Sequence, residues 1–370
     1  MGRRILTVFL AFIIAGTTLA GCTAKTDING TQTEAKEGDQ KETDNSAAPK
    51  YDTLNVGILV GSSAIPVLYA RDQGWFEELG LDVNIITFPT GSPINEAFAA
   101  DQLDIASYGA AGIFAMSTGE CTMVGEPNTG GGLGLFVRED NPILEHQGEN
   151  TVYPEAYGSA ETVKGLKAML PLGTASQFVL LQWAKGFGLT ESDLEQIHME
   201  YPSAYQAFSS GEGDAVAVSP PYYFNCIEDG YTEVSGFDQD YYTDMIIARN
   251  AVLEERKEEV ILFLKALYRA CEALTDDEVR TEYSIPAFAD LGAEYTEETM
   301  AQEITVRKYI DQAYMEQEGY QFASWLMPTA EFYVTTEKLT EDQVDIVRDA
   351  VDLSYLEEAL EIDLSGAYEQ

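Results

Sequence analysis

Hydroxyl side chains recur where predicted strands turn into predicted helices, which is where a small molecule could be bound. These candidate binding residues, together with one neighbouring glycine, are Ser62, Ser63, Ser92, Gly109, Thr174, Ser176 and Ser219. A helix N-terminus presents unpaired N–H groups and a partial positive charge, so such junctions attract anionic or strongly polar groups. Each hydroxyl could instead cap its own helix without touching a ligand.

Three tyrosines and one acid belong to the same junctions. Tyr108, Tyr222 and Tyr223 could wall a planar ligand, or could be ordinary members of the chain's 21 tyrosines. Glu126 follows a predicted strand and, if it faces the ligand, would oppose an anion and suit an amine or a ring N–H. No Lys or Arg lies in these loops. A zwitterion such as taurine and a neutral heteroaromatic such as an aminopyrimidine both fit these features.

The sequence offers little for metal binding or catalysis. His146 and His198 are its two histidines, and Cys121, Cys226 and Cys271 are far apart, without the spacing of a zinc site. There is no nucleophile-elbow, Walker or dinucleotide fingerprint. We therefore predict no metal, no cofactor and no catalytic residue.

The N-terminus predicts export. A basic start, an apolar run over 5–14 and a small-residue site are typical of a secretory signal, which we place at 1–21. The Leu-Ala-Gly-Cys run ending at Cys22 resembles the lipobox of bacterial lipoproteins, which implies palmitate-type acylation of Cys22. The polar segment 22–50 is then a lipidated, disordered tether outside the cytoplasm, anchored to the bacterial cell membrane. An ordinary cleaved signal with an incidental cysteine is the alternative.

Size and charge narrow the class of protein further. The chain has 370 residues, 45% of them hydrophobic, which is enough for a large core or two domains. Its formal net charge of −42 repels nucleic acid, so no nucleic-acid partner is expected.

The elements that would position these residues alternate along the chain. Strand patterns at 54–60, 81–86 and 104–108 are separated by helical patterns, one of them capped by Ser92, which predicts parallel pairing and an α/β fold. A similar order recurs around a helix starting at Thr174 and a strand over 214–218, which favours two similar lobes.

The lobe boundaries follow from this pattern. We assign 51–145 and 245–370 to lobe 1 and 146–244 to lobe 2, with hinge segments in 137–158 and 234–250. From Ala251 onward apolar residues recur at helical spacing, so C-terminal helices without strands should pack on lobe 1.

Several stretches resemble one family. They are Arg71-Asp-Gln-Gly-Trp-Phe-Glu-Glu-Leu-Gly-Leu-Asp-Val83, Asp104-Ile-Ala-Ser-Tyr-Gly109, Gly173-Thr-Ala-Ser-Gln177, Ser210-Gly-Glu-Gly-Asp-Ala215 and Asp352-Leu-Ser-Tyr-Leu-Glu-Glu-Ala359. In this order they resemble solute-binding proteins of the taurine, alkanesulfonate and nitrate type, a family that includes thiamine-pyrimidine-synthase-like proteins. The resemblance spans 54–360. It implies a type II periplasmic-binding-protein fold, in which a monomer clamps a ligand between two hinged lobes and delivers it to the permease and ATPase of an ABC importer.

Two other functions stay open at this stage. An enzyme like the pyrimidine synthases would, as the resemblance implies, need a substrate histidine and a cysteine-rich iron site, whereas His146 and His198 lie outside the strand-end loops. A ligand-sensing or adhesive surface lipoprotein is the second alternative.

Overall fold

The computed structural model describes residues 50–236 and 242–368. The predicted signal peptide, Cys22 and nearly all of the predicted tether lie outside these residues. Within the described part, no helix is both long enough and apolar enough to cross a membrane.

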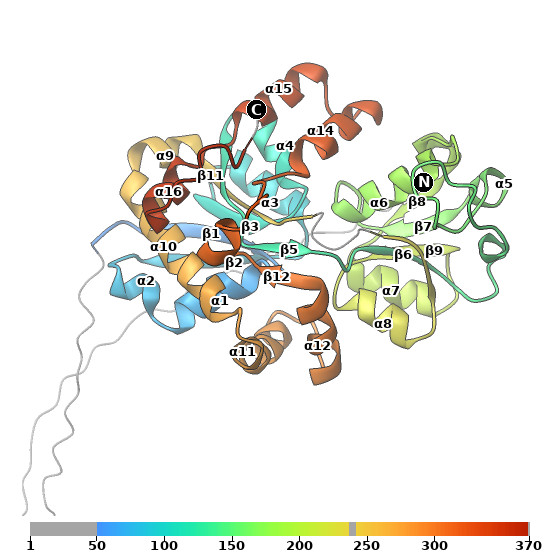
Figure 1. Ribbon diagram of the computed structural model, residues 1–370, viewed down its shortest axis with the longest axis horizontal. Helices are drawn as coiled ribbons and strands as arrows, with labels where there is room; N and C mark the ends of the chain where they lie inside the picture. The colour runs from blue at the N-terminus through green and yellow to red at the C-terminus, as the bar shows by residue number, and fades with distance from the viewer. Residues whose placement is uncertain (1–49, 237–241, 369–370) are drawn as a thin grey trace, which may run out of the picture. The chain divides into compact units, whose positions relative to one another are not determined.

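The first of two five-stranded sheets has the order β2-β1-β3-β11-β4 (Figure 1). Its strands are β1 (Leu54–Leu59), β2 (Val83–Phe88), β3 (Ile105–Tyr108), β4 (Cys121–Gly125) and β11 (Met245–Arg249). β1 is parallel to β2 and β3, whereas β11 runs antiparallel to β3 and β4. The strands predicted from apolar, branched runs are therefore confirmed to within two residues.

The second sheet has the order β10-β6-β9-β7-β8. Its strands are β6 (Gly134–Val137), β7 (Lys167–Leu170), β8 (Glu195–His198), β9 (Ala215–Val218) and β10 (Thr232–Gly236). Read from β8, this is the strand order of the first sheet, with β6 in the place of β11. β6 and β11 are also the strands that the chain enters when it crosses over from the other sheet. The expected pair of similar α/β units is thus visible in the topology.

One predicted strand belongs to the other sheet. The apolar run 134–138 also predicts a strand and falls within 51–145, which we assigned to lobe 1, but β6 pairs with β9 and β10 of the second sheet. The first connection between the sheets therefore runs through 126–133, not through 137–158. The apolar pattern identified the strand correctly, but pattern alone carries no information about which sheet a buried strand joins.

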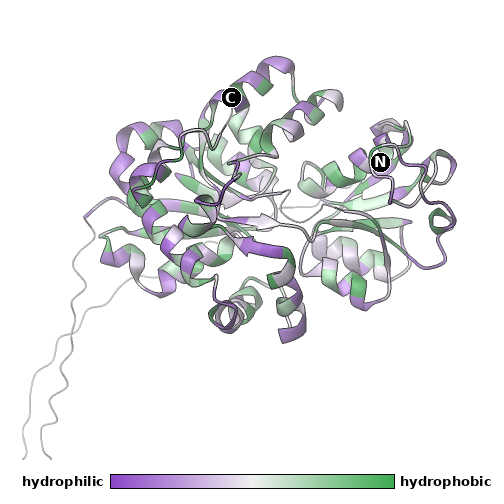
Figure 2. Cartoon of the chain, viewed as in Figure 1, coloured by the Kyte–Doolittle hydropathy of each residue, from purple (hydrophilic) through white to green (hydrophobic). Residues whose placement is uncertain are grey.

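Helices flank both sheets. Those of the first unit are α1 (Ala64–Asp72), α2 (Trp75–Glu78), α3 (Gly91–Ala99) and α4 (Gly112–Met116). Those of the second unit are α5 (Ala160–Val163), α6 (Ala175–Lys185), α7 (Tyr201–Ser209) and α8 (Tyr222–Glu228). Strands are mostly hydrophobic, whereas helices carry both kinds of residue, as expected for elements with one buried face (Figure 2).

The C-terminal part is mainly helical, as predicted. Its helices are α9 (Asn250–Glu255), α10 (Lys257–Ala273), α11 (Asp277–Asp290), α12 (Glu297–Val306), α13 (Gln312–Met315), α14 (Leu326–Thr335), α15 (Glu341–Asp349) and α16 (Ser354–Leu360). α10 packs on the first unit, where Phe263 stacks on Phe76 with ring centroids 5.4 Å apart. α14 also reaches the second unit, since the ring of Phe332 lies 4.7 Å from that of Phe178 on α6.

The prediction that this C-terminal part contains no strand is wrong at one point. β12 (Arg307–Tyr309) pairs antiparallel with β5 (Asn128–Gly130), which lies in the first connection between the sheets. Three residues are too few for an alternating pattern to stand out from the helices around them. This short pair carries the C-terminal part of the chain to the place where the two sheets meet.

Candidate functional site

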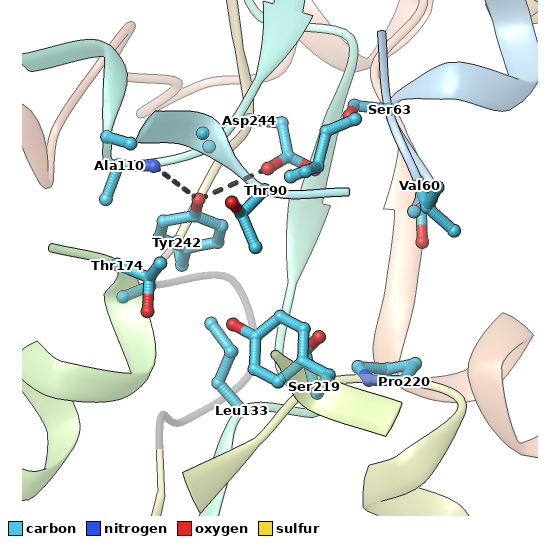
Figure 3. Close-up of a pocket in the computed structure, with 18 of the residues that line it drawn as sticks. Val60, Ser63, Thr90, Ala110, Leu133, Thr174, Ser219, Pro220, Tyr242 and Asp244 are labelled. Carbon is cyan, nitrogen blue, oxygen red and sulfur yellow. Dashed lines mark hydrogen bonds between the residues drawn. The ribbon is translucent and has the colours of Figure 1, made fainter. Parts of the chain in front are cut away.

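A pocket is lined by residues from both sheets at the carboxyl ends of their parallel strands (Figure 3). It has a cavity volume of about 60 Å³, which corresponds to about four to six water-sized positions. Five of the predicted site residues line it, namely Ser62, Ser63, Gly109, Thr174 and Ser219. Strand ends are the expected place for a ligand in open α/β sheets, and the topology brings these ends together.

Three helices begin at this pocket with N-cap hydroxyls that do not cap. Ser63, Thr90 and Thr174 are the N-cap residues of α1, α3 and α6, and none makes a side-chain capping hydrogen bond. At α3 and α6 the caps therefore leave first-turn N–H groups for a bound group. At α1 the N–H groups of Ala64 and Ile65 already donate to the carbonyl oxygens of Gly61 and Ser62, so this end offers the Ser63 hydroxyl instead. The alternative that these hydroxyls serve as caps is wrong for Ser63 and Thr174.

Ser63 is the clearest case. Its side chain is 1% exposed, yet Oγ has no hydrogen-bond partner among the described residues. A buried hydroxyl without a partner costs free energy unless a ligand or water satisfies it. Thr174 differs, because its hydroxyl donates to the carbonyl oxygen of Pro171 at 2.8 Å and keeps only acceptor capacity.

The pocket also contains an arginine that the sequence argument missed. Arg307, on β12, is buried and lines the pocket. Its Nε donates to the carbonyl oxygen of Gly131 at 3.0 Å, and Nη1 lies 3.7 Å from Oδ2 of Asp244. Burial acts to lower the pKa of Arg307, but the charges of Asp244 and Glu303 outweigh it and raise that pKa. The guanidinium is thus a fixed positive charge.

Asp244 and Tyr242 also line the pocket, and they precede β11 in the second connection between the two sheets. The Tyr242 hydroxyl donates to Oδ1 of Asp244 at 3.2 Å and accepts from the Ala110 N–H at 2.8 Å (Figure 3). Asn128 donates its amide to Oδ2 of Asp244 at 2.9 Å. Burial, with the Asp244 charge adding to it, raises the pKa of Tyr242 far above its usual value, so this hydroxyl stays protonated.

Ser62 lines the pocket, but its hydrogen is already used. Its hydroxyl donates to the buried carboxylate of Glu303, which also accepts from the hydroxyl of Tyr295. Arg280 approaches the same carboxylate at 3.6 Å. Ser62 can therefore only accept a hydrogen bond from a ligand. Ser62, Arg280, Tyr295 and Glu303 form a buried hydrogen-bonded and charged cluster next to the pocket.

Three predicted residues are placed away from this pocket. Tyr108 is fully buried in the core and donates to the side chain of Asn95 at 2.8 Å. Ser92 is exposed inside α3 because Thr90, not Ser92, is the N-cap residue. The Ser176 hydroxyl is hydrogen-bonded to the Tyr201 hydroxyl at 3.0 Å and does not itself line the pocket, whereas Tyr201 does.

The other two tyrosines also lie outside it. Tyr223 donates to Glu233 at 2.8 Å and packs its ring against Phe136, so it belongs to the second unit's interior. Tyr222, the first residue of α8, lines a neighbouring chamber instead.

Glu126 does not line this pocket, and the expectation that it constrains the ligand's charge is wrong. Its carboxylate is 1% exposed and accepts hydrogen bonds from the Tyr320 hydroxyl, the Thr243 hydroxyl and the Ala323 N–H, at 2.6, 3.0 and 3.0 Å. Burial raises the pKa of Glu126 to about 7, although these three donors act to lower it. Its role is to join segments of the chain, and no amine on the ligand is required to face it.

The electrostatics of the pocket favour one small anionic group. Among the residues lining it, Arg307 and Asp244 are the charged side chains and offset one another. The N-termini of α1, α3 and α6 then add partial positive charge. In the described residues, no group of three or more His, Cys, Asp or Glu side chains is placed to hold a metal ion.

The strand order and this pocket between two α/β units define a protein of the periplasmic-binding-protein fold. The chain belongs to the NMT1-like family, whose model matches residues 47–285.

Curated relatives and solved structures agree with this assignment. A protein of Brachyspira hyodysenteriae, named as an ABC transporter periplasmic binding protein, is 28% identical over 83% of this chain and 90% of its own length. A Bacillus subtilis protein, named for binding aliphatic sulfonates, is 26% identical over 84% of this chain and 90% of its own. The crystal structure of the nitrate-binding protein NrtA from Synechocystis aligns with a TM-score of 0.68 and 15% identity, covering 86% of this chain and 91% of that one.

Proposed function

We propose that this protein is the solute-binding component of an ABC-type importer, and that it captures a small anion. The observation that carries the proposal is the meeting of Ser63, Thr90 and Thr174, three N-cap residues without side-chain caps, at one pocket beside Arg307. Helix ends such as those of α3 and α6, whose first-turn N–H groups no side-chain cap satisfies, are suited to bind the oxygens of an anion, and the Ser63 hydroxyl adds a donor at α1. The names of the relatives, for sulfonates and nitrate, support the same ligand chemistry.

Capture would couple to closure of the two units. Ser63 and Thr90 belong to the first unit, whereas Thr174 and Ser219 belong to the second, and all four line the pocket. A ligand that contacts both units binds best when they are close, so it shifts the population toward the closed state. The closed form would then be the one presented to the permease and its ATPase.

The protein would act outside the cytoplasm, held to the membrane by acylated Cys22. The basic, apolar and small-residue segments before that cysteine support this part of the proposal. Enzymatic activity is not part of it, because the relatives are named as binding proteins.

Titration calorimetry tests the proposal directly. Methanesulfonate, nitrate, ethylammonium and a neutral aminopyrimidine are titrated into the purified protein under identical conditions. We expect the anions to bind and the cation and the neutral ring not to. Tighter binding of the neutral aminopyrimidine than of either anion would overturn the proposed ligand class.

A further inference from the structure

A second chamber opens directly beside the anion pocket. It has a cavity volume of about 160 Å³ and shares four lining residues with the pocket, namely Val60, Gly61, Tyr201 and Pro220. Because the two cavities have these residues in common, a single ligand could occupy both. The pocket would then hold its charged group, and the chamber would hold whatever is attached to that group.

The chamber has apolar walls from both units. Pro202, Pro221 and Tyr222 come from the starts of α7 and α8 in the second unit. Facing the same space are Phe288 and Leu291 from the C-terminal end of α11. Proline rings are rigid and aromatic rings are flat, so these walls can pack against a flat ligand with little loss of rotamer freedom.

The position of Phe288 in the chamber wall is fixed by the hydrogen-bonded cluster of Tyr295, Glu303 and Ser62. Phe288 is 1% exposed and stacks on Tyr295, with ring centroids 4.3 Å apart and planes 21° apart. The Tyr295 hydroxyl in turn donates to Glu303, which also holds Ser62 of the pocket. One hydrogen-bonded unit therefore sets the geometry of the pocket and of the chamber together.

Volume indicates the size of the group that fits. An apolar cavity of about 150 Å³ in another protein accepts benzene, and this chamber is of the same size at about 160 Å³. A nitrate ion, which has no attached group, would leave the chamber without ligand.

Charge limits the group as well. Glu200 contributes a carboxylate to the lining, and no Lys or Arg is found among the residues that line the chamber. A second negative charge on the ligand would therefore be repelled, and the attached group should be uncharged.

We propose that the ligand is an anion whose single charged group is attached to one uncharged, flat six-membered ring, with the charge in the pocket and the ring in the chamber. This inference rests on the proposed function, since it names the class of solute for the same site. The chamber would then select the ligand by its uncharged ring, whereas the pocket binds the ligand's charged group.

Matched sulfonates test the inference on the full protein. Benzenesulfonate, butanesulfonate, methanesulfonate and benzene-1,3-disulfonate are compared by calorimetry. Burying a Phe-sized ring should make benzenesulfonate bind about ten- to a hundredfold more tightly than methanesulfonate. Butanesulfonate should fall between them, and the disulfonate should bind more weakly than benzenesulfonate.

A pair of variants on α11 separates the chamber from the pocket. Leu291→Asp places a charge in the chamber and should lower benzenesulfonate affinity by a larger factor than methanesulfonate affinity, which removes the preference for the ring. Ala289→Asp adds the same charge at an exposed position two residues away and should change neither affinity. Thermal unfolding of both variants checks that each is folded.

Two outcomes would overturn the inference, and they differ in what else they overturn. If methanesulfonate or butanesulfonate binds at least as tightly as benzenesulfonate, the ring assignment is wrong and the proposed function stands. If none of the sulfonates and no nitrate binds, the proposed function fails and the inference fails with it.

Discussion

The hydroxyl of Thr243 donates a 3.0 Å hydrogen bond to the carboxylate of Glu126, and this contact joins the two connections between the sheets. Glu126 directly follows β4 on the first connection, whereas Thr243 precedes β11 on the second. The hydroxyl of Tyr268 on α10 is also hydrogen-bonded to the backbone N–H and carbonyl of Glu126. Glu126 therefore fixes both connections to the first unit. Any change in the angle between the two units would have to occur in these connections.

Removing the Glu126 side chain should destabilise the fold. Glu126→Ala leaves the hydroxyls of Tyr320 and Thr243 and the N–H of Ala323 without their acceptor. We expect a loss of about 1–3 kcal/mol or more in the free energy of unfolding, measured by urea denaturation at pH 6. Glu318→Ala, at an exposed position near the same segment, is the control and should have little effect. An unchanged stability of Glu126→Ala would show that this contact does not hold the connections.

Glu126 should also make stability depend on pH. Burial raises its pKa in the folded protein to about 7 from a usual value near 4.5, so the folded state holds the proton more strongly than the unfolded state. Its contribution is fully present below pH 4.5 and is lost as pH rises through 7.

The measurement compares the protein with Glu126→Gln, which cannot titrate. Between pH 5 and pH 8 the free energy of unfolding of the unmodified protein should fall relative to that of the variant, by up to about 3 kcal/mol. Parallel curves for the two proteins would contradict the raised pKa. Using the difference between the curves removes the contribution of the other carboxylates.

Ser63→Ala should weaken anion binding without weakening the fold. Because the Oγ of Ser63 has no partner in the described residues, its removal breaks no internal hydrogen bond. Losing one hydrogen bond to a charged ligand should lower affinity by about ten- to a hundredfold.

Ser284→Ala provides a matched control for that experiment. Ser284 is equally buried, and its Oγ is likewise without a partner among the described residues, but it lies on α11 and does not line the pocket. Calorimetry should show unchanged anion affinity for this variant. If both serine variants lose affinity to the same extent, Ser63 has no special role at the site.

Arg307 should matter for binding and for folding in separable ways. Arg307→Met leaves the buried carboxylate of Asp244 without its cation, which should cost about 3–5 kcal/mol of stability. Adding Asp244→Asn removes the unpaired charge and should restore most of that stability. Anion affinity should stay low in the double variant, since the pocket then lacks its positive side chain. Full anion affinity in a stable double variant would exclude Arg307 from recognition.

Cys22→Ala should release the protein from membranes. Without acyl chains, the proposed lipid anchor at Cys22 is lost. Fractionation of the producing bacteria should move the variant to the soluble extracytoplasmic or culture fraction, while Thr23→Ala stays with the membrane. Membrane retention of Cys22→Ala would contradict the predicted lipidation.

The sequence predicted the fold better than it predicted the pairing of its parts. Apolar alternation located β1, β3 and β9 closely, and helical spacing of apolar residues after Ala251 identified the helical C-terminal part. These signals are local. The sheet that β6 joins and the pairing of β12 with β5 depend on contacts between segments far apart in the chain, on which local patterns carry no information.

The candidate site divides in the same way. Ser63, Thr174 and Ser219 were found because a strand end followed by a helix start is a local pattern. Tyr242 and Arg307 were missed because they lie in a connection and in a three-residue strand, where neither spacing nor composition marks a site. Glu126 was chosen for its place after a strand, but its carboxylate is hydrogen-bonded to Tyr320, Thr243 and Ala323 and does not line the pocket.

The pairing of β12 with β5 brings Arg307 to the pocket from outside the part of the chain that the family model matches. The family model ends at residue 285, and Arg307 comes after it. Both five-stranded sheets lie wholly within the matched residues, whereas the arginine that lines the pocket comes from beyond them. A match to the family model therefore does not by itself report the charge that lines the pocket, because the arginine that supplies it lies beyond the matched residues.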